Sequence, residues 1–369
     1  MAERSPTTGP ASQPQPPFKL LFCGTEFPAA AEKTREVVQQ TESLRALLEI
    51  VQCDREHVRE EIQDAVIVVP KMCRIDRDMV ASAPNLRLIN QFGVGLEGVD
   101  VKACAEHGVY VTNIPSDGTG NAASCAEHAL YLMLGLLRRQ NQMQESIRNR
   151  VLGAPMGRTL MGLSVLMVGF GNIGRELAVR LKPFGVSLAA VRRQEWPSEP
   201  LPDREIATSA QLTGSPEHAE TYLDHRGGPE DTLRLAAEAD VVVLVCNLTQ
   251  ETRGMVDGAF VQAMKPGALL VNLARGGLLD KFAVLEGLQT GQLGGLAMDV
   301  QWTEPFDPDD PVAKHPNVIL TPHIAGVTTL SMTNMARQLA HNVQNVLSGQ
   351  HPLPRTDSTR SCGMLRFTA

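Results

Sequence analysis

The sequence predicts an α/β protein with two doubly wound parallel sheets, carried by two lobes with a cleft between them. Short runs rich in Val, Ile and Leu alternate with amphipathic segments from Phe18 onward, and the pattern resumes after a long apolar helix expected to begin near Ala126. Strands interleaved with helices typically form parallel sheets that are covered on both faces. The 369 residues, 43% of them apolar, are enough for two such cores.

Each lobe has its own series of predicted elements. In the first, strands are expected at 19–24, 48–54, 64–70, 86–92 and 109–113, with helices at 55–62 and 76–83. In the second, strands are expected at 164–170, 186–191, 239–246, 267–274, 294–300 and 317–323. A last helix, near 329–348, carries apolar residues at helical spacing. We therefore expect a first lobe of residues 18–125 completed by 327–352, and a second lobe of residues 126–326.

Three segments do not fit either series. Residues 1–17 are rich in Pro, Ser, Thr and Gln and predict a disordered leader, and residues 353–369 predict a flexible tail. Residues 195–231 form an irregular polar insert, which we interpret as a solvated loop.

Bulk composition argues against several classes of partner. The net charge is −7 and aromatic residues make up 4%, with no long basic block, so we expect no nucleic-acid surface. No apolar run approaches the roughly 20 residues that span a bilayer, so we expect no membrane partner. Seven cysteines without a CxxC pair favour reduced thiols in a cytoplasmic setting over a thiol nucleophile. Organellar targeting by residues 1–17 stays an alternative, supported by one arginine alone.

A glycine-rich motif, GFGNIG, directly follows one predicted strand and opens a helix that leads to a second strand. Such a βαβ unit binds the pyrophosphate of a dinucleotide at the helix N-terminus, where glycine lets the backbone approach closely. The expected coenzyme contacts are Gly169, Gly171, Asn172, Ile173 and Gly174.

A second match to the same pattern, GVGLEG at 93–98, has a different meaning. Glu97 stands where a pyrophosphate would approach, and the two negative charges would repel. The backbone N–H groups of Val94 and Gly95 are instead predicted to bind a smaller anion.

Arg192 and Arg193 stand at the end of the strand after the first motif, where an NAD-binding fold most often has an acid. A guanidinium cannot accept a hydrogen bond from a ribose hydroxyl, but it can pair with a 2′-phosphate. We therefore expect a preference for NADP(H), with NAD(H) possible if both arginines lie on the solvated surface. The 195–231 insert begins just here, so an overhang of the coenzyme site is an alternative to a plain loop.

Three reactive side chains are expected at or just beyond strand ends in the second series. Arg275 is placed to hold a carboxylate and polarise a carbonyl. His323 and the loop residue Glu304 can form an acid–base pair in which the carboxylate fixes the imidazole tautomer. Asp299 closes a strand nearby.

GFGNIG, NLARGGLLD, MDVQWTEP and LTPHIAGVT together resemble, in order and spacing, the motifs of the D-isomer-specific 2-hydroxyacid dehydrogenase family. The resemblance runs from about Phe18 to Pro352 and implies two Rossmann/flavodoxin-like lobes. It implies that Arg275, Glu304 and His323 are catalytic, that Val94, Gly95 and Arg275 bind substrate, and that Asp299 lies near the nicotinamide. It also implies a homodimer formed through the coenzyme lobes.

The implied reaction is the reversible reduction of a small 2-keto acid, such as glyoxylate or hydroxypyruvate, to a D-2-hydroxy acid. A nucleotide-sensing scaffold or corepressor with the same fold is the alternative, although it would not need Arg275, Glu304 and His323 together. A formate dehydrogenase is disfavoured, because that branch of the family lacks the Glu paired with the catalytic His.

Overall fold

The computed structural model describes residues 17–196 and 216–353. Contacts divide the chain into two compact units: Met1–Thr119 with Thr329–Ala369, here unit 1, and Gly120–Thr328, here unit 2. The predicted leader and tail lie almost wholly outside the described residues, as does the middle of the 195–231 insert.

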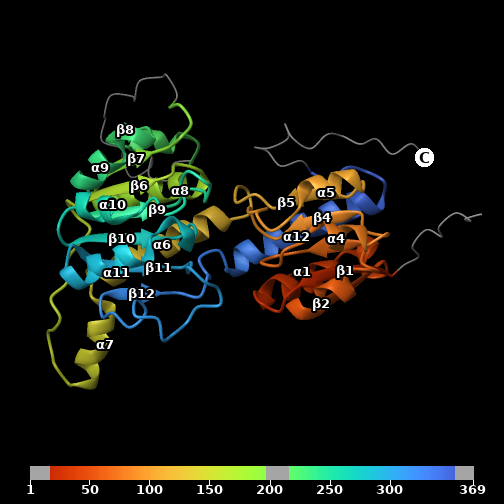
Figure 1. The fold of residues 1–369 in the computed structure, drawn as a ribbon, viewed down its shortest axis with the longest axis horizontal. Helices are drawn as coiled ribbons and strands as arrows, with labels where there is room; N and C mark the ends of the chain where they lie inside the picture. The colour runs from red at the N-terminus through yellow and green to blue at the C-terminus, as the bar shows by residue number, and fades with distance from the viewer. Residues whose placement is uncertain (1–16, 197–215, 354–369) are drawn as a thin grey trace, which may run out of the picture. The chain divides into compact units, whose positions relative to one another are not determined.

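Unit 1 contains a five-stranded parallel sheet in the order β2-β1-β3-β4-β5, the order found in flavodoxin-like folds (Figure 1). Its strands are β1 (Phe18–Cys23), β2 (Leu48–Cys53), β3 (Ile67–Val69), β4 (Leu88–Gln91) and β5 (Tyr110–Asn113). Its short helices include α2 (Glu42–Arg45), α3 (Val58–Glu61), α4 (Arg77–Ala81) and α5 (Val101–Glu106). All five strands predicted for this part of the chain are confirmed.

The two longest helices of unit 1 come from opposite ends of the sequence. Helix α1 (Pro28–Gln40) packs against α12 (Thr329–Leu347), which also contacts β4. The buried Asn342 of α12 donates to Asn90 Oδ1 of β4 at 2.8 Å, so a polar pair fixes this helix on the sheet. The final helix predicted near 329–348 is therefore confirmed. It packs against a sheet whose strands all come from the first third of the chain.

Unit 2 contains a seven-stranded parallel sheet in the order β12-β11-β10-β9-β6-β7-β8. The strands are β6 (Ser164–Val168), β7 (Ser187–Val191), β8 (His225–Gly227), β9 (Val241–Leu244), β10 (Ala268–Asn272), β11 (Leu293–Met298) and β12 (Val318–Leu320). Alternate residues face opposite sides: Val165 and Met167 join one apolar cluster with α6 and α8, whereas Leu166 and Val168 join another with α9–α11. The helices are α6 (Asn121–Leu137), α8 (Asn172–Leu181), α9 (Thr232–Glu238), α10 (Gly258–Ala263) and α11 (Lys281–Thr290). The doubly wound class is confirmed.

Strand β8 corrects the prediction that residues 195–231 are irregular throughout. His225–Gly227 pairs with β7 in parallel, and short 3₁₀ turns lie on either side at 216–222 and 229–231. Because β8 is the edge strand of the sheet, its polar sequence needs no apolar run to mark it.

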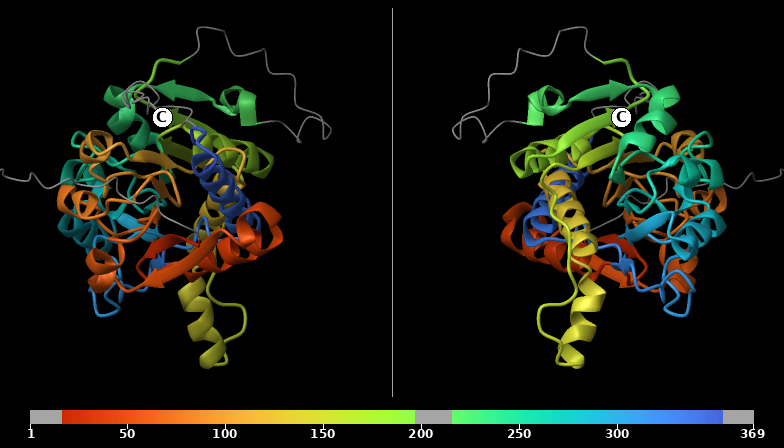
Figure 2. Two further views of the ribbon diagram at one scale, coloured as in Figure 1. Left: turned by 90° about the vertical axis from the view of Figure 1, so that its right-hand side faces the viewer. Right: turned by 90° about the vertical axis from the view of Figure 1, so that its left-hand side faces the viewer.

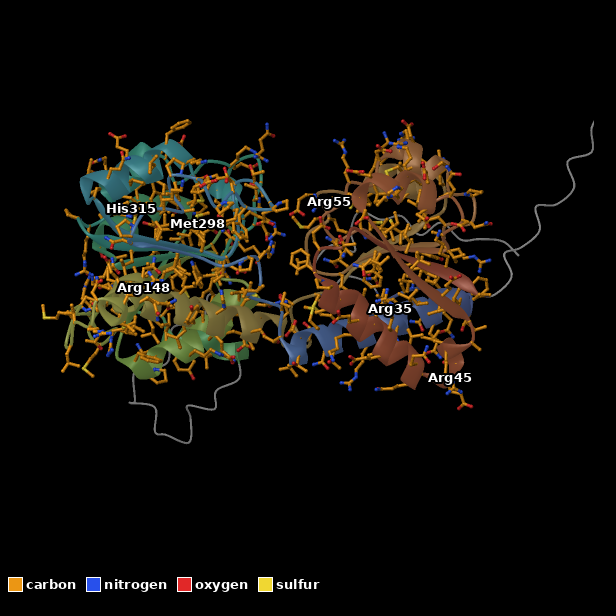
Figure 3. All side chains as sticks on the ribbon, turned by 90° about the horizontal axis from the view of Figure 1, so that it is seen from below. Arg35, Arg45, Arg55, Arg148, Met298 and His315 are labelled. Atoms are coloured by element: carbon orange, nitrogen blue, oxygen red, sulfur yellow. The ribbon has the colours of Figure 1, made fainter. Side chains whose placement is uncertain are left out.

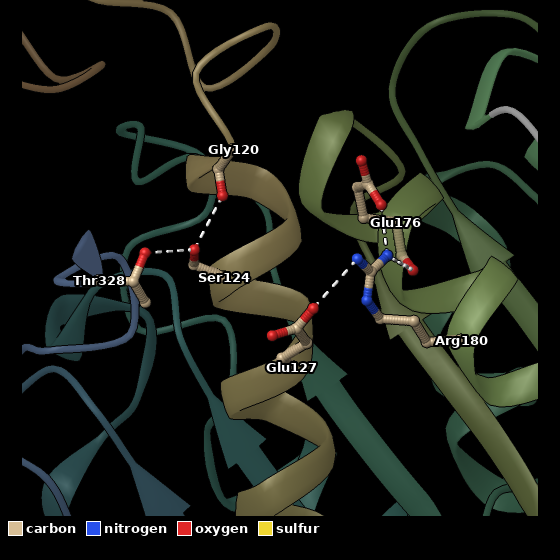
Figure 4. Close-up of polar contacts among 6 residues, drawn as sticks. All are labelled: Gly120, Ser124, Glu127, Glu176, Arg180 and Thr328. Atoms are coloured by element: carbon tan, nitrogen blue, oxygen red, sulfur yellow. Dashed lines mark hydrogen bonds and ion pairs between the residues drawn. The ribbon is translucent and has the colours of Figure 1, made fainter. Parts of the chain in front are cut away.

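The long helix α6 begins at Asn121, five residues before the predicted start at Ala126. Its first turn, Asn121-Ala122-Ala123-Ser124, has only small side chains and no large apolar residue, so the large apolar residues mark only the later turns. Ser124 Oγ donates to Gly120 O and meets Thr328 Oγ1, each at 2.8 Å (Figure 4). Farther along, Arg180 of α8 joins Glu127 to Glu176, so α6 is tied to α8 as well.

Helix α7 (Gln140–Arg148) extends away from the sheet of unit 2, as two directions of view show (Figures 1 and 2). Among the described helices, none is both long enough and apolar enough to cross a membrane.

Candidate functional site

The glycine-rich turn after β6 has one open position and two closed ones. Gly169 has φ +105°, and a Cβ there would lie 2.7 Å from the backbone nitrogen of Cys246. A Cβ on Gly174 would lie 2.9 Å from Gly169 O, whereas one on Gly171 would meet nothing within 4 Å. Gly171 is also the N-cap of α8. The turn therefore has the features that a pyrophosphate needs: a tight bend, close helix packing and an open helix N-terminus.

Arg275 follows β10 on a turn that Asn272 holds in shape. The buried Asn272 side chain donates to Arg275 O and accepts from Ala274 N, each at 2.9 Å. A Cβ on Gly276 would lie 2.1 Å from Gln301 O, so only glycine lets this turn pack on the segment after β11. That segment carries Glu304, and the packing brings the Arg275 and Glu304 loops together.

His323 and Glu304 form a hydrogen-bonded pair. His323 Nδ1 lies 2.8 Å from Glu304 Oε2, and Glu304 Oε1 accepts from Gln301 N at 2.9 Å. Both side chains are mostly buried, with exposed fractions of 27% for His323 and 20% for Glu304. With the Nδ1 proton directed at the carboxylate, Nε2 is the nitrogen that exchanges a proton with a substrate.

The charge of Glu304 is stabilised by its neighbours. Burial on its own raises the pKa of this carboxyl, but the hydrogen bond and charge of His323, the amide of Gln301 and the charge of Arg275 outweigh it. The net effect lowers the pKa of Glu304 below its ordinary value. Glu304 is therefore ionised at neutral pH and accepts from both partners.

The loop that carries His323 is held by Asp299. This carboxylate is 1% exposed and accepts from Thr321 Oγ1 at 2.6 Å, Ile324 N at 2.9 Å and Ala325 N at 2.8 Å. His323 itself has φ +57°, in the left-handed region. In the described structure Asp299 thus contacts the loop on both sides of His323, while its expected place near a nicotinamide stays a prediction.

His128 of α6 extends this support. Its Nε2 lies 2.9 Å from Thr321 Oγ1, and burial lowers its pKa although the charge of Asp299 opposes the shift. Since the Thr321 hydroxyl gives its only proton to Asp299, it must accept from the Nε2–H of a neutral His128. A chain of donors therefore runs from α6 through Thr321 to the buried carboxylate.

The second glycine motif lies in unit 1. Asn113 Nδ2 donates to Val94 O at 2.6 Å, and Ile75 N donates to Gly98 O at 2.8 Å, so neighbouring segments hold the turn. Helix α5 begins only at Val101, and Glu97 is exposed. The turn therefore does not open a helix as the first motif does.

The two arginines after β7 differ in their surroundings. Arg192 is partly buried, donates to the carbonyl of Gln194 and lies over the Trp196 ring at 4.3 Å, whereas Arg193 is exposed. The reading that both lie on the solvated surface therefore does not describe Arg192.

Cysteine chemistry has little support in the described residues. None of the six described cysteines forms a disulfide with another described cysteine, and Cys362 lies outside the described ranges. Burial raises the pKa of Cys125 to about 12 and that of Cys246 to about 11. These thiols therefore stay protonated at neutral pH, when a nucleophile would need the thiolate.

Several supporting residues were not predicted. Asn272, Gln301 and Thr321 adjoin the predicted site residues in sequence, but their roles depend on side-chain bonds that no spacing reveals. His128 stands on a helix with apolar periodicity and gives no signal of its own. Trp196 and Arg226 lie in the insert, which was interpreted as a loop.

Comparison with known proteins identifies the family. Residues 130–325 match the model of the D-isomer specific 2-hydroxyacid dehydrogenase, NAD binding domain. The chain belongs to the D-isomer specific 2-hydroxyacid dehydrogenase family. This membership accounts for the two parallel sheets and for the glycine-rich turn at the start of α8.

Relatives in this family carry different names. The chain is 31% identical to a glyoxylate reductase of Korarchaeum cryptofilum, over 75% of this chain and 78% of that protein. It is 31% identical to a D-3-phosphoglycerate dehydrogenase of Archaeoglobus fulgidus over 80% of this chain, but spans only about half (51%) of that relative's length. A solved NADPH-dependent glyoxylate/hydroxypyruvate reductase of Sinorhizobium meliloti, in complex with NADP and malonate, matches with TM-score 0.71 and 25% identity, covering 90% of this chain and 94% of that one.

The ionised state of Glu304 predicts a pH-dependent stability difference. At pH 7, Glu304→Gln should melt at a lower temperature than the parent, because the amide cannot accept from both Gln301 and His323. A lowered carboxyl pKa stabilises the fold above the ordinary value of 4.5, and this contribution is lost as pH falls through the folded value. The gap in Tm should therefore shrink from pH 7 to pH 4. The exposed Glu286→Gln on α11 is the control and should follow the parent throughout; a gap for Glu304→Gln that stays constant with pH would contradict this account.

Proposed function

We propose that the protein reversibly reduces a small 2-keto acid to a D-2-hydroxy acid with NADP(H). The observation that carries the proposal is the His323–Glu304 pair at 2.8 Å, in the unit whose glycine turn fits a dinucleotide and whose Arg275 acts on Glu304. A nucleotide-binding scaffold would not require this set of residues.

Arg275 and the Val94–Gly95 turn are proposed to bind the substrate. The Arg275 guanidinium offers a cationic fork to a carboxylate and to the carbonyl oxygen on which negative charge develops. The backbone N–H groups of Val94 and Gly95 are proposed to bind a small anion. Glyoxylate and hydroxypyruvate are the first substrates to test.

His323 is proposed to give its Nε2 proton to the carbonyl oxygen during reduction and to take it back during oxidation. Glu304 is proposed to hold the ring in the tautomer and orientation that this transfer needs, since it bonds to Nδ1. The positive φ of His323 directs the ring from a loop that Asp299 holds rigidly.

The coenzyme is proposed to bind at the N-terminus of α8, where Gly171 has open space and Gly169 and Gly174 are packed. The nicotinamide, when bound, supplies or removes the hydride at the substrate carbon. Asn172 and Ile173, at the start of α8, are proposed to contact the pyrophosphate. Arg192, and Arg193 beside it, are proposed to select the 2′-phosphate of NADP(H) over the 2′-hydroxyl of NAD(H).

Loss of either proposed catalytic group should strongly lower turnover and spare coenzyme binding. Arg275→Ala and His323→Ala should each lower kcat/KM for glyoxylate or hydroxypyruvate reduction by about a hundredfold or more, because removing one such donor costs about 2.7–4 kcal/mol. Dissociation constants for NADPH should stay within about twofold of the parent. His315→Ala, in the loop before β12, is the matched control and should keep normal turnover (Figure 3). Unchanged turnover in either site variant would refute the assignment.

The coenzyme preference can be tested separately. Arg192→Asp should weaken NADPH binding about ten- to two-hundredfold, the range expected for one charge-assisted hydrogen-bonded pair, and should not weaken NADH binding. Arg337→Asp, an equal charge change on the exposed side of α12, should alter neither. Titration of both coenzymes into the parent and the variants measures the effect. An equal change for NADPH and NADH would count against a role for Arg192 in selection.

We also propose a homodimer formed through unit 2. The α7 helix and the segment after it expose an unusual set of apolar side chains: Ile147 (70%), Leu152 (102%), Met156 (89%) and Met161 (73%). Apolar surface of this kind on an extended element is typical of a subunit interface.

Leu152→Asp combined with Ile147→Asp should convert the dimer to a monomer in sedimentation equilibrium at micromolar concentration, because charges would be buried in the interface. Phe282→Asp, at an 84% exposed position on α11, is the matched control and should leave the dimer intact. A parent protein that sediments as a monomer would refute the proposal.

A further inference from the structure

Trp196 connects three parts of unit 2 at the carboxyl end of its sheet. Its Nε1–H donates to Gly227 O at 3.0 Å, just after Arg226 on β8. Its ring centroid lies 5.4 Å from that of Phe170, in the glycine turn. The same ring lies under two guanidinium groups, with the Arg192 Cζ at 4.3 Å and the Arg226 Cζ at 5.4 Å. One aromatic side chain thus positions two cations next to the start of α8.

A third arginine adds to the positive charge. Arg175, in the first turns of α8, lies over Phe170 at 6.0 Å and approaches Glu220 Oε2 at 3.7 Å. Burial, and then the charges of Arg175 and Arg226, lower the pKa of Arg192, while Glu220 opposes them. Three guanidinium groups therefore face one carboxylate, which leaves an excess of two positive charges in this cluster.

Only some of the hydrogen-bond donors of the Arg226 guanidinium have acceptors among the described residues of unit 2. Its Nη2 donates to Glu220 O at 3.1 Å, but its buried Nε has no hydrogen-bond acceptor among the residues that the structure describes. Like charges held this close repel one another, and a bound dianion would relieve that repulsion. A phosphate attached to a bound adenosine has the required charge and acceptors.

We propose that Arg226, which Trp196 positions beside Arg192, is a second determinant of coenzyme choice and contacts the 2′-phosphate of NADP(H). Parallel pairing places Arg226 opposite Ala190, two residues before Arg192 on the neighbouring strand. Arg192 follows the end of β7, and both guanidinium groups contact the Trp196 ring, so Arg192 and Arg226 lie beside the same side chain at this end of the sheet. The 195–231 insert thus supplies the second guanidinium group, that of Arg226. This inference rests on the proposed use of NADP(H).

The test measures binding to the full chain by isothermal titration calorimetry. The ligands are NADPH, NADH, 2′,5′-ADP and 5′-AMP, so that each pair differs only in the 2′-phosphate. Arg226→Met should weaken NADPH and 2′,5′-ADP about ten- to hundredfold and leave NADH and 5′-AMP within about twofold. Arg234→Met on α9, which removes an exposed arginine from the opposite face of the sheet, is the matched control and should change none of them.

Other outcomes would overturn the inference. If Arg226→Met weakens both ligands of a pair equally, Arg226 has a purely structural role. If it changes the affinity for none of the ligands, Arg226 does not belong to the coenzyme site. If Arg226→Met does not fold, Arg226→Lys should still lose several-fold in NADPH affinity alone, and full affinity in that variant would also count against the role. If the parent protein binds NADPH and NADH equally tightly, the proposed contact of Arg226 with the 2′-phosphate is refuted. Reduction of keto acids with NADH would in that case still support the proposed oxidoreductase function.

Discussion

The candidate site depends on one buried carboxylate. Asp299 accepts from Thr321 Oγ1 and from the backbone amides of Ile324 and Ala325, on both sides of His323. A left-handed non-glycine residue such as His323 costs about 1–3 kcal/mol. A hydrogen bond to a charged group contributes about 1.5–3 kcal/mol, so three of them exceed that cost. Without Asp299 the loop would lose the hydrogen bonds that hold the His323 imidazole in place against Glu304.

The neighbouring loops are also each fixed by one or two residues. Asn272 shapes the turn of Arg275, and Gly276 lets that turn approach the segment of Glu304. Each side chain predicted to react is therefore carried on a short connection after a strand, and each connection is fixed by a buried polar group or by a missing side chain. Parallel strands bring these connections to one edge of the sheet, which explains why the segments that carry residues 275, 304 and 323 lie next to one another.

The sequence contained most of the fold because parallel sheets leave a strong local pattern. All eleven predicted strands are present, since buried runs such as those of β6 and β10 are apolar on both faces. Strand β8 was not predicted because an edge strand can be polar. The start of α6 was misplaced because its first turn has only small side chains, which give no large apolar residue at helical spacing. Reactive residues at strand ends were identifiable by type. The residues that orient them, such as His128 and Asn272, were not, because their contacts join segments far apart in sequence or depend on turn geometry.

Unit 2 is a continuous stretch of chain, whereas unit 1 is interrupted by it. The ribosome makes β1–β5 first, yet the face of α1 that packs on α12 and the side chain of Asn90 gain their partners only when residues 329–347 have emerged. During translation the nascent amino-terminal sheet must therefore persist half-covered while some two hundred later residues, including the whole of unit 2, are added. The discontinuity exposes the newborn chain, more than the finished protein, to premature association.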